Sequence, residues 1–598
     1  MKSSQEKLSQ AIQFHNADML QEAGELYGQI LHSEPNNAEV LHLFGILMNQ
    51  IGDFDTAVSV ILKAIELNPQ DSYYCSLGNA CFDKGDEDAA INCYLKTIEL
   101  NPRNLDAYNN LGMVYTAKEM FDDAIICYQK ALEINSGYPE IYNNLGSVFF
   151  EVNKIEQAIK CYEKAIELNP NYTQAYFNIG NAYKGNDNFV RKIDNPEHLD
   201  KAVSYYQKAL ELMPDFADVY INLGKVYFYK GYTDKELSCY QKALELKPDS
   251  AQIYNNIGNI YKDKGLIKEA IPYFEKSIEL NPNSVDVYSN LAISYLALQD
   301  FEKGWHNYQW RLHDSQVYKT RISGIKQPLW DGSSLDGKTI YVYHEQGFGD
   351  TVNFVRYLPI LHSMGAKVLF KPQKELEKLL RQSDIKAEII DNSTPDESLT
   401  FDTHIPLMSI PYFLKATAEN IPLSDKYLKA DPEKVKFYKE NYFNNDSFKL
   451  GINWQCRNFD HVDVFRSIPH LSYFYPFAKL DGVKIYSFQK GCGTDQLVDL
   501  PEGIEVINLG DTFDDFSDTA AALENLDLLI SVDTSVPHIA GALGIPAWIL
   551  LQYVPDWRWF QDSNTTPWYD SVKLFRQKQI NNWQEIIDEV YSKLQKHI

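Results

Sequence analysis

The feature that most constrains this 598-residue chain is a residue pattern that returns every 34 positions. Gly112, Gly146 and Gly180 are separated by this interval, and so are Gly224 and Gly258. Each glycine stands in a Tyr-x-x-Leu/Ile-Gly-x-x-Tyr/Phe frame, and in several copies an alanine, an aromatic residue and a proline follow it. A period of this length is typical of solenoids built from helix pairs, because each unit covers its apolar face by stacking on the next.

The composition of the frame explains how such a unit packs. Glycine and alanine fit where two antiparallel helices approach closely, the aromatic residues are expected to fill the gap to the next repeat, and proline ends the second helix. Eight or nine copies precede residue 311, and they resemble the tetratricopeptide repeat. The interval from Tyr183 to Ala202 is longer by about ten residues, which predicts a loop at Asn186 to Glu197. The segment from Trp305 to Arg311 is expected to cap the array and join it to the rest of the chain.

An asparagine precedes the leucine or isoleucine of the frame in six successive copies. These are Asn110, Asn144, Asn178, Asn222, Asn256 and Asn290. The position is neither core nor turn, so the side chains are expected in the concave groove, where an amide can pair with the backbone of an extended peptide of any sequence. The array resembles that of the eukaryotic O-linked N-acetylglucosamine transferase, and this resemblance implies a groove that holds protein substrates. The alternative is that asparagine is simply common at this place in such repeats.

After residue 338 the pattern changes to β-rich runs that alternate with helical patterns, which predicts an α/β region with parallel sheets. We therefore expect a repeat array over 1–311, a linker over 312–337, a first lobe over 338–430 and a second lobe over 431–598. The segment from Ala430 to Asn445 has no sheet pattern and is expected to connect the lobes. The strands are predicted at Thr339–Tyr343, Lys367–Phe370, Glu388–Ile390 and Asp402–Ile405 in the first lobe, and at Lys449–Trp454, Lys484–Gln489, Glu505–Leu509, Leu528–Val532, Ala547–Leu551 and Lys573–Phe575 in the second.

A glycine turn follows the first of these strands. The chain crosses Gly347 and Gly349, and from Asp350 onward its apolar residues have the spacing of a helix face. A strand, a glycine turn and a helix start form half of a βαβ unit. Such a turn brings the polar atoms of a substrate close to the backbone N–H groups at the positive end of a helix, so we expect Gly349 on the acceptor side of a site.

Three motifs carry a family resemblance. Gly347-Phe-Gly-Asp350, Ser487-Phe-Gln-Lys490 and the long segment from Ser531 to Pro546 look like the lipopolysaccharide heptosyltransferase family. That family implies a GT-B glycosyltransferase, in which two Rossmann-like lobes face one cleft. Together with the repeat array, the chain resembles bacterial protein glycosyltransferases, including those that modify flagellin. The resemblance implies a nucleotide-sugar donor and a protein acceptor, of which a flagellin is one candidate.

The resemblance also suggests roles for the acidic side of the site. Inverting glycosyl transfer needs a base that takes the proton of the acceptor hydroxyl. The aspartate that heptosyltransferases use as the base matches Asp350, and His344 and Glu345 are the reserve candidates. The alternatives are that Asp350 only caps its helix, a place that aspartate favours, and that either reserve residue is a structural polar group at a strand end.

The departing diphosphate needs N–H donors and positive charge. Asp533, Thr534 and Ser535 follow an apolar strand and precede an Ala/Gly-rich helix, whose free N–H groups suit phosphate oxygens. The alternative for the two hydroxyl residues is plain N-capping. The remaining donor-side candidates are His538, Gln489, Lys490, and Arg466 or Arg457. No Asp-x-Asp motif and no His/Cys cluster with ligand spacing follows residue 338, so we expect no metal and no cofactor beyond the nucleotide-sugar.

The charge balance restricts the partners. The formal net charge of −26 and the pI near 4.9 argue against binding of nucleic acid or of an anionic membrane. No apolar run has the length of a membrane span or the form of a signal peptide, which favours a cytoplasmic protein. We therefore predict an inverting, metal-independent protein O-glycosyltransferase. The alternatives are a transferase that acts on a lipopolysaccharide or other glycan, and a repeat scaffold whose transferase half is inactive.

Overall fold

A computed structural model of the chain describes residues 4–185, 196–313, 325–422, 426–456 and 465–598. The chain divides into two compact units, Met1–Leu246 and Lys247–Ile598. Most of the loop predicted at Asn186 to Glu197 lies outside the described residues, as does Arg457. The division falls inside the repeat array, so the last two helix pairs belong to the same unit as the α/β region. The four predicted domain limits themselves stay predictions.

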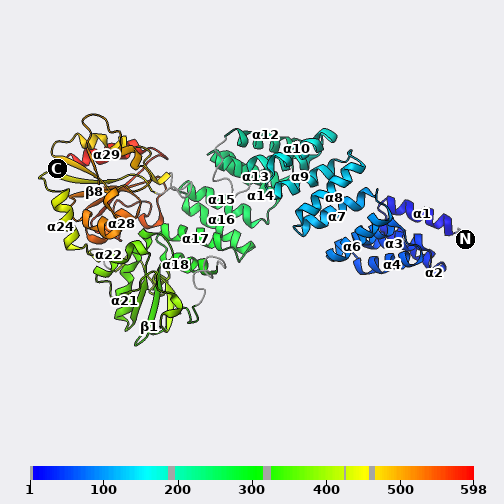
Figure 1. The fold of residues 1–598 in the computed structure, drawn as a ribbon, viewed down its shortest axis with the longest axis horizontal. Coiled ribbons are helices and arrows are strands. Elements are labelled where there is room, and N and C mark those ends of the chain that lie inside the picture. Colours follow the sequence, from blue (N-terminus) through cyan, green and yellow to red (C-terminus); the bar gives the residue numbers. More distant parts are fainter. Residues whose placement is uncertain (1–3, 186–195, 314–324, 423–425, 457–464) are drawn as a thin grey trace. The chain divides into compact units, whose positions relative to one another are not determined.

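The first unit consists of seven helix pairs, counted over its described residues (Figure 1). The pairs are α1 (Ser4–Asn16) with α2 (Leu20–Ser33), α3 (Ala38–Gln50) with α4 (Phe54–Leu67), α5 (Asp71–Lys84) with α6 (Glu87–Leu100), α7 (Leu105–Ala117) with α8 (Phe121–Ile134), α9 (Pro139–Glu151) with α10 (Ile155–Leu168), α11 (Thr173–Lys184) with α12 (Pro196–Leu212), and α13 (Ala217–Tyr229) with α14 (Thr233–Leu246). The frame glycine lies in the first helix of a pair, as the period predicts.

The frame glycine makes room for the aromatic residue of its own repeat. A Cβ atom on Gly146 would lie 2.7 Å from the ring of Tyr162, and one on Gly112 would lie 2.8 Å from the ring of Tyr128. Both rings are almost completely buried. Each ring lies against the bare backbone of the partner helix, because only glycine leaves space for it there. The same rings share a hydrophobic core with residues of the next repeat, which is the place expected for them.

The second unit begins with two further pairs, α15 (Ala251–Asp263) with α16 (Ile267–Leu280) and α17 (Val285–Ala297) with α18 (Phe301–Tyr308). The short 3-10 helix η2 (Gln309–His313) follows. The predicted cap packs on the α/β region: the Trp305 indole N–H donates to the Ala416 carbonyl at 3.0 Å, and Arg311 makes a two-pronged ion pair with Glu345 at 2.7 and 2.9 Å. These contacts tie the end of the array to the loop after the first strand.

Two parallel sheets form the α/β region. The strands are β1 (Thr339–Tyr343), β2 (Lys367–Lys371), β3 (Glu388–Ile389) and β4 (Thr403–Pro406) in one sheet, and β5 (Phe448–Asn453), β6 (Val483–Ser487), β7 (Val506–Asn508), β8 (Leu528–Val532), β9 (Ala547–Leu551) and β10 (Val572–Arg576) in the other. Their spatial orders are β3-β2-β1-β4 and β10-β9-β8-β5-β6-β7. The larger sheet therefore has the doubly wound order, with its point of reversal between β5 and β8. All ten strands match the predicted runs to within two residues at either end.

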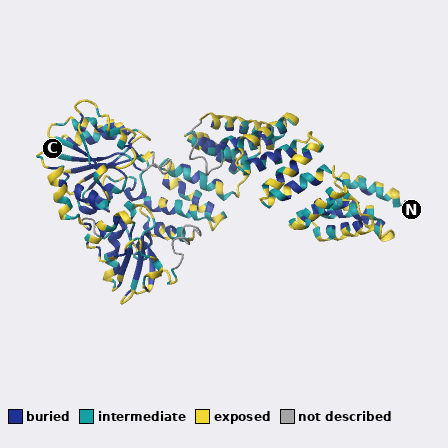
Figure 2. Cartoon of the chain, viewed as in Figure 1, coloured by how far each residue is buried: buried dark blue, intermediate teal, exposed yellow. Residues whose placement is uncertain are grey.

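Helices cover the sheets, so the central strands are buried on both faces (Figure 2). The helices are α20 (Phe348–Phe354), α21 (Leu358–Ser363), α22 (Glu377–Gln382), α23 (Ile410–Phe413), α24 (Pro432–Asn441), α26 (Tyr475–Ala478), α27 (Phe516–Leu523), α28 (Ser535–Leu543) and α29 (Trp583–Leu594). Every residue of β8 and β9 is buried, and Trp548 is the most exposed of them. Apolar side chains on both faces explain why these strands appear in the sequence as runs that are apolar except for the buried Ser531.

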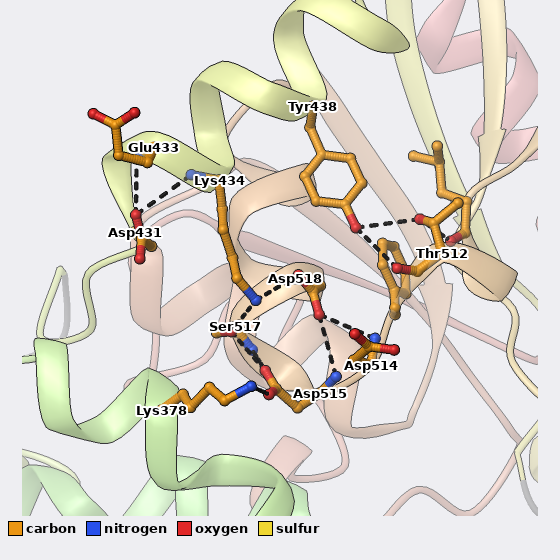
Figure 3. Close-up of polar contacts among 12 residues, drawn as sticks. Lys378, Asp431, Glu433, Lys434, Tyr438, Thr512, Asp514, Asp515, Ser517 and Asp518 are labelled. Atoms are coloured by element: carbon orange, nitrogen blue, oxygen red, sulfur yellow. Dashed lines mark hydrogen bonds and ion pairs between the residues drawn. The ribbon is translucent and has the colours of Figure 1, made fainter.

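The connection between the lobes is a helix, α24, and it is fastened by ion pairs (Figure 3). Lys434 of α24 contacts the Asp518 carboxylate at 2.6 Å and the Ser517 hydroxyl at 2.7 Å, both in α27. From the first lobe, Lys378 of α22 reaches the Asp515 carboxylate at 2.7 Å. These acidic residues also cap α27, because Asp515 accepts from the Ser517 backbone N–H at 2.9 Å. The acidic start of α27 therefore holds the two lobes together.

Replacing Gly146 by alanine tests the packing of the frame. The new methyl group would overlap the Tyr162 ring, so the free energy of unfolding should fall by about 1–3 kcal/mol. Gly28, in α2, is the control, because no atom outside its own helix lies within 4 Å of an added Cβ. There the same change should raise stability by about 0.5–1 kcal/mol. Denaturant unfolding of the two variants measures both; equal effects would show that the glycine–ring contact is not tight.

Candidate active site

The point of reversal in the larger sheet brings together the carboxyl ends of β5 and β8, and ligands of doubly wound sheets bind at such points. Asn453 ends β5, and Asp533 and Thr534 follow β8. The Thr534 hydroxyl donates to the Asn453 side-chain carbonyl at 3.1 Å. Thr534 is the N-cap of α28, but its hydroxyl makes no capping bond to that helix. The first backbone N–H groups of α28 therefore keep the hydrogen-bonding capacity that an anion can use.

The first lobe contributes the start of α20, which lies against the start of α28. A Cβ atom on Gly349 would lie 2.8 Å from the His538 ring and 3.6 Å from Ser535 Cα. Glycine is required here because two helices meet almost backbone to backbone. The predicted acceptor-side residue Gly349 and the predicted donor-side residues Ser535 and His538 are therefore neighbours, as the sequence alone could not show.

Asp350, the predicted base, lies in the first turn of α20 and is largely buried. Its Oδ2 accepts the Gly347 backbone N–H at 2.9 Å, so it does cap its helix. Its Oδ1 forms an ion pair with Arg558 of the second lobe. Burial raises the pKa of the Asp350 carboxyl above its ordinary value, and Arg558 opposes that shift. Capping and action as a base use different lone pairs of the carboxylate and are compatible.

His538 is an uncharged part of the same cluster. Its Nδ1 lies 2.9 Å from the Tyr569 hydroxyl, its Nε2 lies 3.9 Å from Asp533 Oδ1, and its ring stacks on Trp559 with 5.0 Å between ring centres. Burial, reinforced by the nearby Arg558, lowers the pKa of His538 to about 3. The imidazole is therefore neutral near pH 7. It can supply a hydrogen bond to a ligand but no charge.

Two predicted donor-side cations lie near the carboxyl edge of the larger sheet. Arg466 donates to the Asp533 carbonyl at 3.1 Å, so it lies beside the start of α28. The exposed Lys490 donates to the Phe513 carbonyl. Burial raises the pKa of the Asp533 carboxyl, and Arg466 opposes the shift. The sequence placed these residues after strand ends, and the structure gathers them at that edge.

The side-chain amide of Gln489 is bonded to other groups of the protein through both its oxygen and its nitrogen. Its side-chain carbonyl accepts three hydrogen bonds of 3.0–3.2 Å, from the backbones of Trp454 and Gln455 and from the Asn453 amide. Its NH₂ group donates to the carbonyls of Gln455 and Cys492 at 2.9 and 2.8 Å. The amide joins the loops after β5 and β6. Its predicted role in donor binding stays a prediction, and the geometry makes that role indirect.

The side chain of the reserve candidate His344 contacts the backbone of β2. Its Nδ1 lies 3.1 Å from the Lys371 carbonyl, across the pair of β1 and β2. Its neighbour Glu345 binds Arg311 and accepts from the Met408 backbone N–H at 3.1 Å. Both side chains therefore hold the strand end and the repeat cap, which is the structural alternative considered for His344.

The six frame asparagines are half-buried, and five of them are bonded to other asparagines of the preceding repeat. Each of five donates from Nδ2 to an asparagine of the preceding repeat, over distances of 2.8–3.4 Å. The pairs are Asn110 to Asn79, Asn144 to Asn109, Asn178 to Asn143, Asn222 to Asn181 and Asn290 to Asn255. Asn256 occupies the same place in α15. One N–H of each of these five amides is thus used between repeats, whereas Nδ2 of Asn256 is buried and has no hydrogen-bond partner in the described part of the chain. A second N–H and a carbonyl lone pair of each of the five remain to contact a peptide.

Sequence reasoning missed Asn453, Asp556 and Arg558. Arg558 lies in η10 (Trp557–Trp559), beyond the end of β9, and binds Asp556 Oδ1 at 2.8 Å as well as Asp350. Burial opposes ionisation of Asp556, but the pairing with Arg558 keeps the pKa of that carboxyl below its ordinary value. The available signal is that the segment from Tyr553 to Trp559, which contains Asp556 and Arg558, follows the end of a predicted strand.

Neither a metal-binding group nor a membrane span is found in the part of the chain that the structure describes. Over those residues, no three His, Cys, Asp or Glu side chains are arranged to hold a metal ion. Over the same residues, no helix combines the length and the apolar character needed to cross a bilayer. Metal independence and the absence of a further cofactor stay predictions.

Comparison with known proteins supports the repeat assignment. The family described as tetratricopeptide repeat matches 38–71, 105–138, 127–160, 217–250, 251–284 and 273–306, and the related TPR repeat family matches 78–119, 146–187 and 198–231. The chain carries tetratricopeptide repeats. These matches end before the α/β region, so they describe the array alone.

The similar proteins are matched over only part of their length or of this chain. Protein FlbA of Caulobacter vibrioides is 24% identical over 331 residues, which are 51% of this chain and 54% of FlbA. MamA is 31% identical and covers 29% of this chain and 95% of its own, with a TM-score of 0.26. YrrB, described as a TPR protein with an unusual peptide-binding site, is 30% identical over 32% of this chain and 94% of its own, with a TM-score of 0.27. The TM-scores are too low to establish a shared arrangement.

Replacing His538 tests its neutral, buried state. Because its folded pKa is about 3 and the ordinary value is 6.5, the unfolded chain takes up a proton first as the pH falls. Its contribution to stability is complete above pH 6.5 and is lost progressively toward pH 3, at a cost of about 2 kcal/mol by pH 5. His538→Asn should therefore show a shallower loss of stability between pH 7 and 5 than the wild type. The exposed His470→Asn is the control and should keep the wild-type slope in denaturant unfolding.

Proposed function

We propose that the chain is an inverting, metal-independent glycosyltransferase of the GT-B type, which moves a sugar from a nucleotide-sugar to a serine or threonine hydroxyl of a protein. The observation that carries this proposal is the placement of a buried carboxylate of one lobe, Asp350, beside the start of α28 in the other lobe. A base and an anion-binding helix end are the two groups that the reaction requires.

The groups can be given roles in one displacement. Asp350 takes the proton of the acceptor hydroxyl as its oxygen forms a bond to the anomeric carbon of the sugar. The bond from that carbon to the diphosphate breaks, and the nucleoside diphosphate leaves with the electron pair. The first N–H groups of α28 and the cations Arg466 and Lys490 stabilise the leaving charge. The raised pKa of Asp350 supports a base of useful strength.

The repeats support a protein acceptor. Tetratricopeptide repeats present a groove along their first helices, and here that position carries amides with spare hydrogen-bonding capacity, as at Asn144 and Asn178. Within the second unit, the last repeat is joined to the loop that precedes Asp350 through Arg311 and Glu345. A polypeptide bound along α17 would therefore approach the candidate base on a fixed support. A flagellin fits this proposal as one acceptor.

The first test is Asp350→Asn. Loss of the base should reduce the rate of transfer at least about 100-fold, while the nucleotide-sugar still raises the melting temperature. In the wild type, kcat/KM should fall on acidification as Asp350 is protonated, and the fall should be centred above the ordinary aspartate value of 3.8, because burial raises this pKa. The exposed Asp384→Asn is the control. Transfer at the wild-type rate by Asp350→Asn would remove the base from the proposal.

The second test concerns the groove. Asn144→Ala with Asn178→Ala should raise the KM for a protein acceptor about tenfold and leave kcat nearly unchanged, because each lost hydrogen bond costs about 0.5–1.5 kcal/mol. Asn68→Ala with Asn135→Ala is the matched control, since these exposed residues stand at the ends of second helices. Mass spectrometry of the acceptor measures the rates. An equal effect of both pairs would mean that stability, rather than binding, had changed.

A further inference from the structure

The candidate base is held by a cation from the opposite lobe. Arg558 places one terminal nitrogen on Asp350 and the other on Asp556, the latter at 2.8 Å. Its side chain is 8% exposed, against 21% for Asp350 and 29% for Asp556. The acidic side chains therefore face the accessible side, and the guanidinium lies between them. In this state the proton-accepting oxygen Oδ1 of Asp350 is occupied by Arg558.

The charges around Arg558 are unbalanced in a way that matters for an anion. Asp350, Asp533 and Asp556 supply three carboxylates, and Arg466 and Arg558 supply two guanidiniums. A diphosphate that entered this cluster would meet carboxylates as well as cations, so it needs an arginine that turns toward it. The planar guanidinium is well suited to this exchange, because it binds carboxylate and phosphate oxygens with the same two-pronged geometry.

The position of Arg558 suits the exchange. The residue that follows it, Trp559, stacks on His538 in the first turns of α28, so Arg558 lies next to the candidate anion site. Its backbone carbonyl is held by the Trp568 indole N–H at 2.9 Å. Its guanidinium lies 4.4 Å from the centre of the Trp557 ring, a surface along which it can move without losing its cation–π contact. The side chain can therefore change partners while the loop stays in place.

We infer that Arg558 exchanges Asp350 for the diphosphate of the donor, so that the base is released only when a donor is bound. This inference rests on the proposed function, because it assigns the release of the same base. Before the donor binds, the ion pair keeps Asp350 from acting on water or on an acceptor. After it binds, Arg558 neutralises part of the leaving charge, and Asp350 Oδ1 is free to take the acceptor proton.

A double-mutant cycle with inorganic pyrophosphate tests the exchange on the full chain. Calorimetric titration should give an affinity for Arg558→Gln at least tenfold below that of the wild type. Asp350→Asn should bind pyrophosphate several-fold more tightly than the wild type, because it no longer competes for Arg558. In the Arg558→Gln background, Asp350→Asn should raise the pyrophosphate affinity much less than it does in the wild type. The non-additivity is the signature of exchange.

Two other results would overturn the inference. If the carboxylate only repels the anion through space, Asp350→Asn will raise the pyrophosphate affinity equally in the wild type and in Arg558→Gln. If Arg558 serves only to hold the lobes together, Asp350→Asn will not raise that affinity. The exposed Arg381→Gln is the matched control and should leave the pyrophosphate affinity unchanged. Melting temperatures check folding, and Arg558→Lys, which keeps the charge but loses the fork, covers the case in which Arg558→Gln is unfolded: it should bind pyrophosphate with intermediate affinity, and wild-type affinity would count against exchange.

The outcome for the proposed function is read separately, from transfer assays with nucleotide-sugars. If transfer depends on Asp350 but the effects of the two substitutions on pyrophosphate affinity are additive, the exchange is ruled out and the proposed transferase activity stands. If the two substitutions are coupled in pyrophosphate binding but no acceptor is modified, the proposed transferase activity is ruled out and Arg558 remains an anion-exchanging group. Absence of pyrophosphate binding by the wild type would count against both.

Discussion

The candidate site depends on the close contact between the starts of α20 and α28. Gly349 has no side chain, and a Cβ there would overlap the His538 ring. This contact brings a carboxylate of the first lobe within reach of Arg558 of the second, so neither lobe contains the site by itself. Two positive helix ends that meet also favour the acidic side chains found around them, since each helix start attracts negative charge.

The buried charges in this contact add little to stability, which supports the proposed function. An ion pair removed from water loses hydration that its own attraction only partly restores, and apolar side chains of similar size often stabilise a protein as well. Here Asp350, Asp533 and Asp556 lie with Arg466 and Arg558 among Trp557, Trp559 and Tyr569. Perturbed carboxyl groups in such a setting are common at active sites, and the same surroundings keep His538 uncharged.

The repeat array does not end where its sequence pattern ends. The last two helix pairs belong to the same compact unit as the two sheets, and Trp305 and Arg311 fix them to the α/β region. The ion pair of Arg311 with Glu345 gives Glu345, which follows β1, a structural role. The end of the array therefore supports the loop that precedes Asp350. In the proposed reaction, this joint makes the position of a bound polypeptide relevant to the chemistry.

The sequence by itself determined the local structure and the repeat. The 34-residue period predicted the helix pairs, and the mostly apolar, β-rich runs predicted β1, β8 and β9 to the residue, because strands buried on both faces need mostly apolar side chains. Only the tertiary structure decided which strand ends meet. Arg558 is 208 residues from Asp350 along the chain, and no local pattern relates them. The sheet order brings Asn453 to Asp533 and Thr534, and the bare backbone of Gly349 admits His538, because both depend on packing between elements distant in sequence.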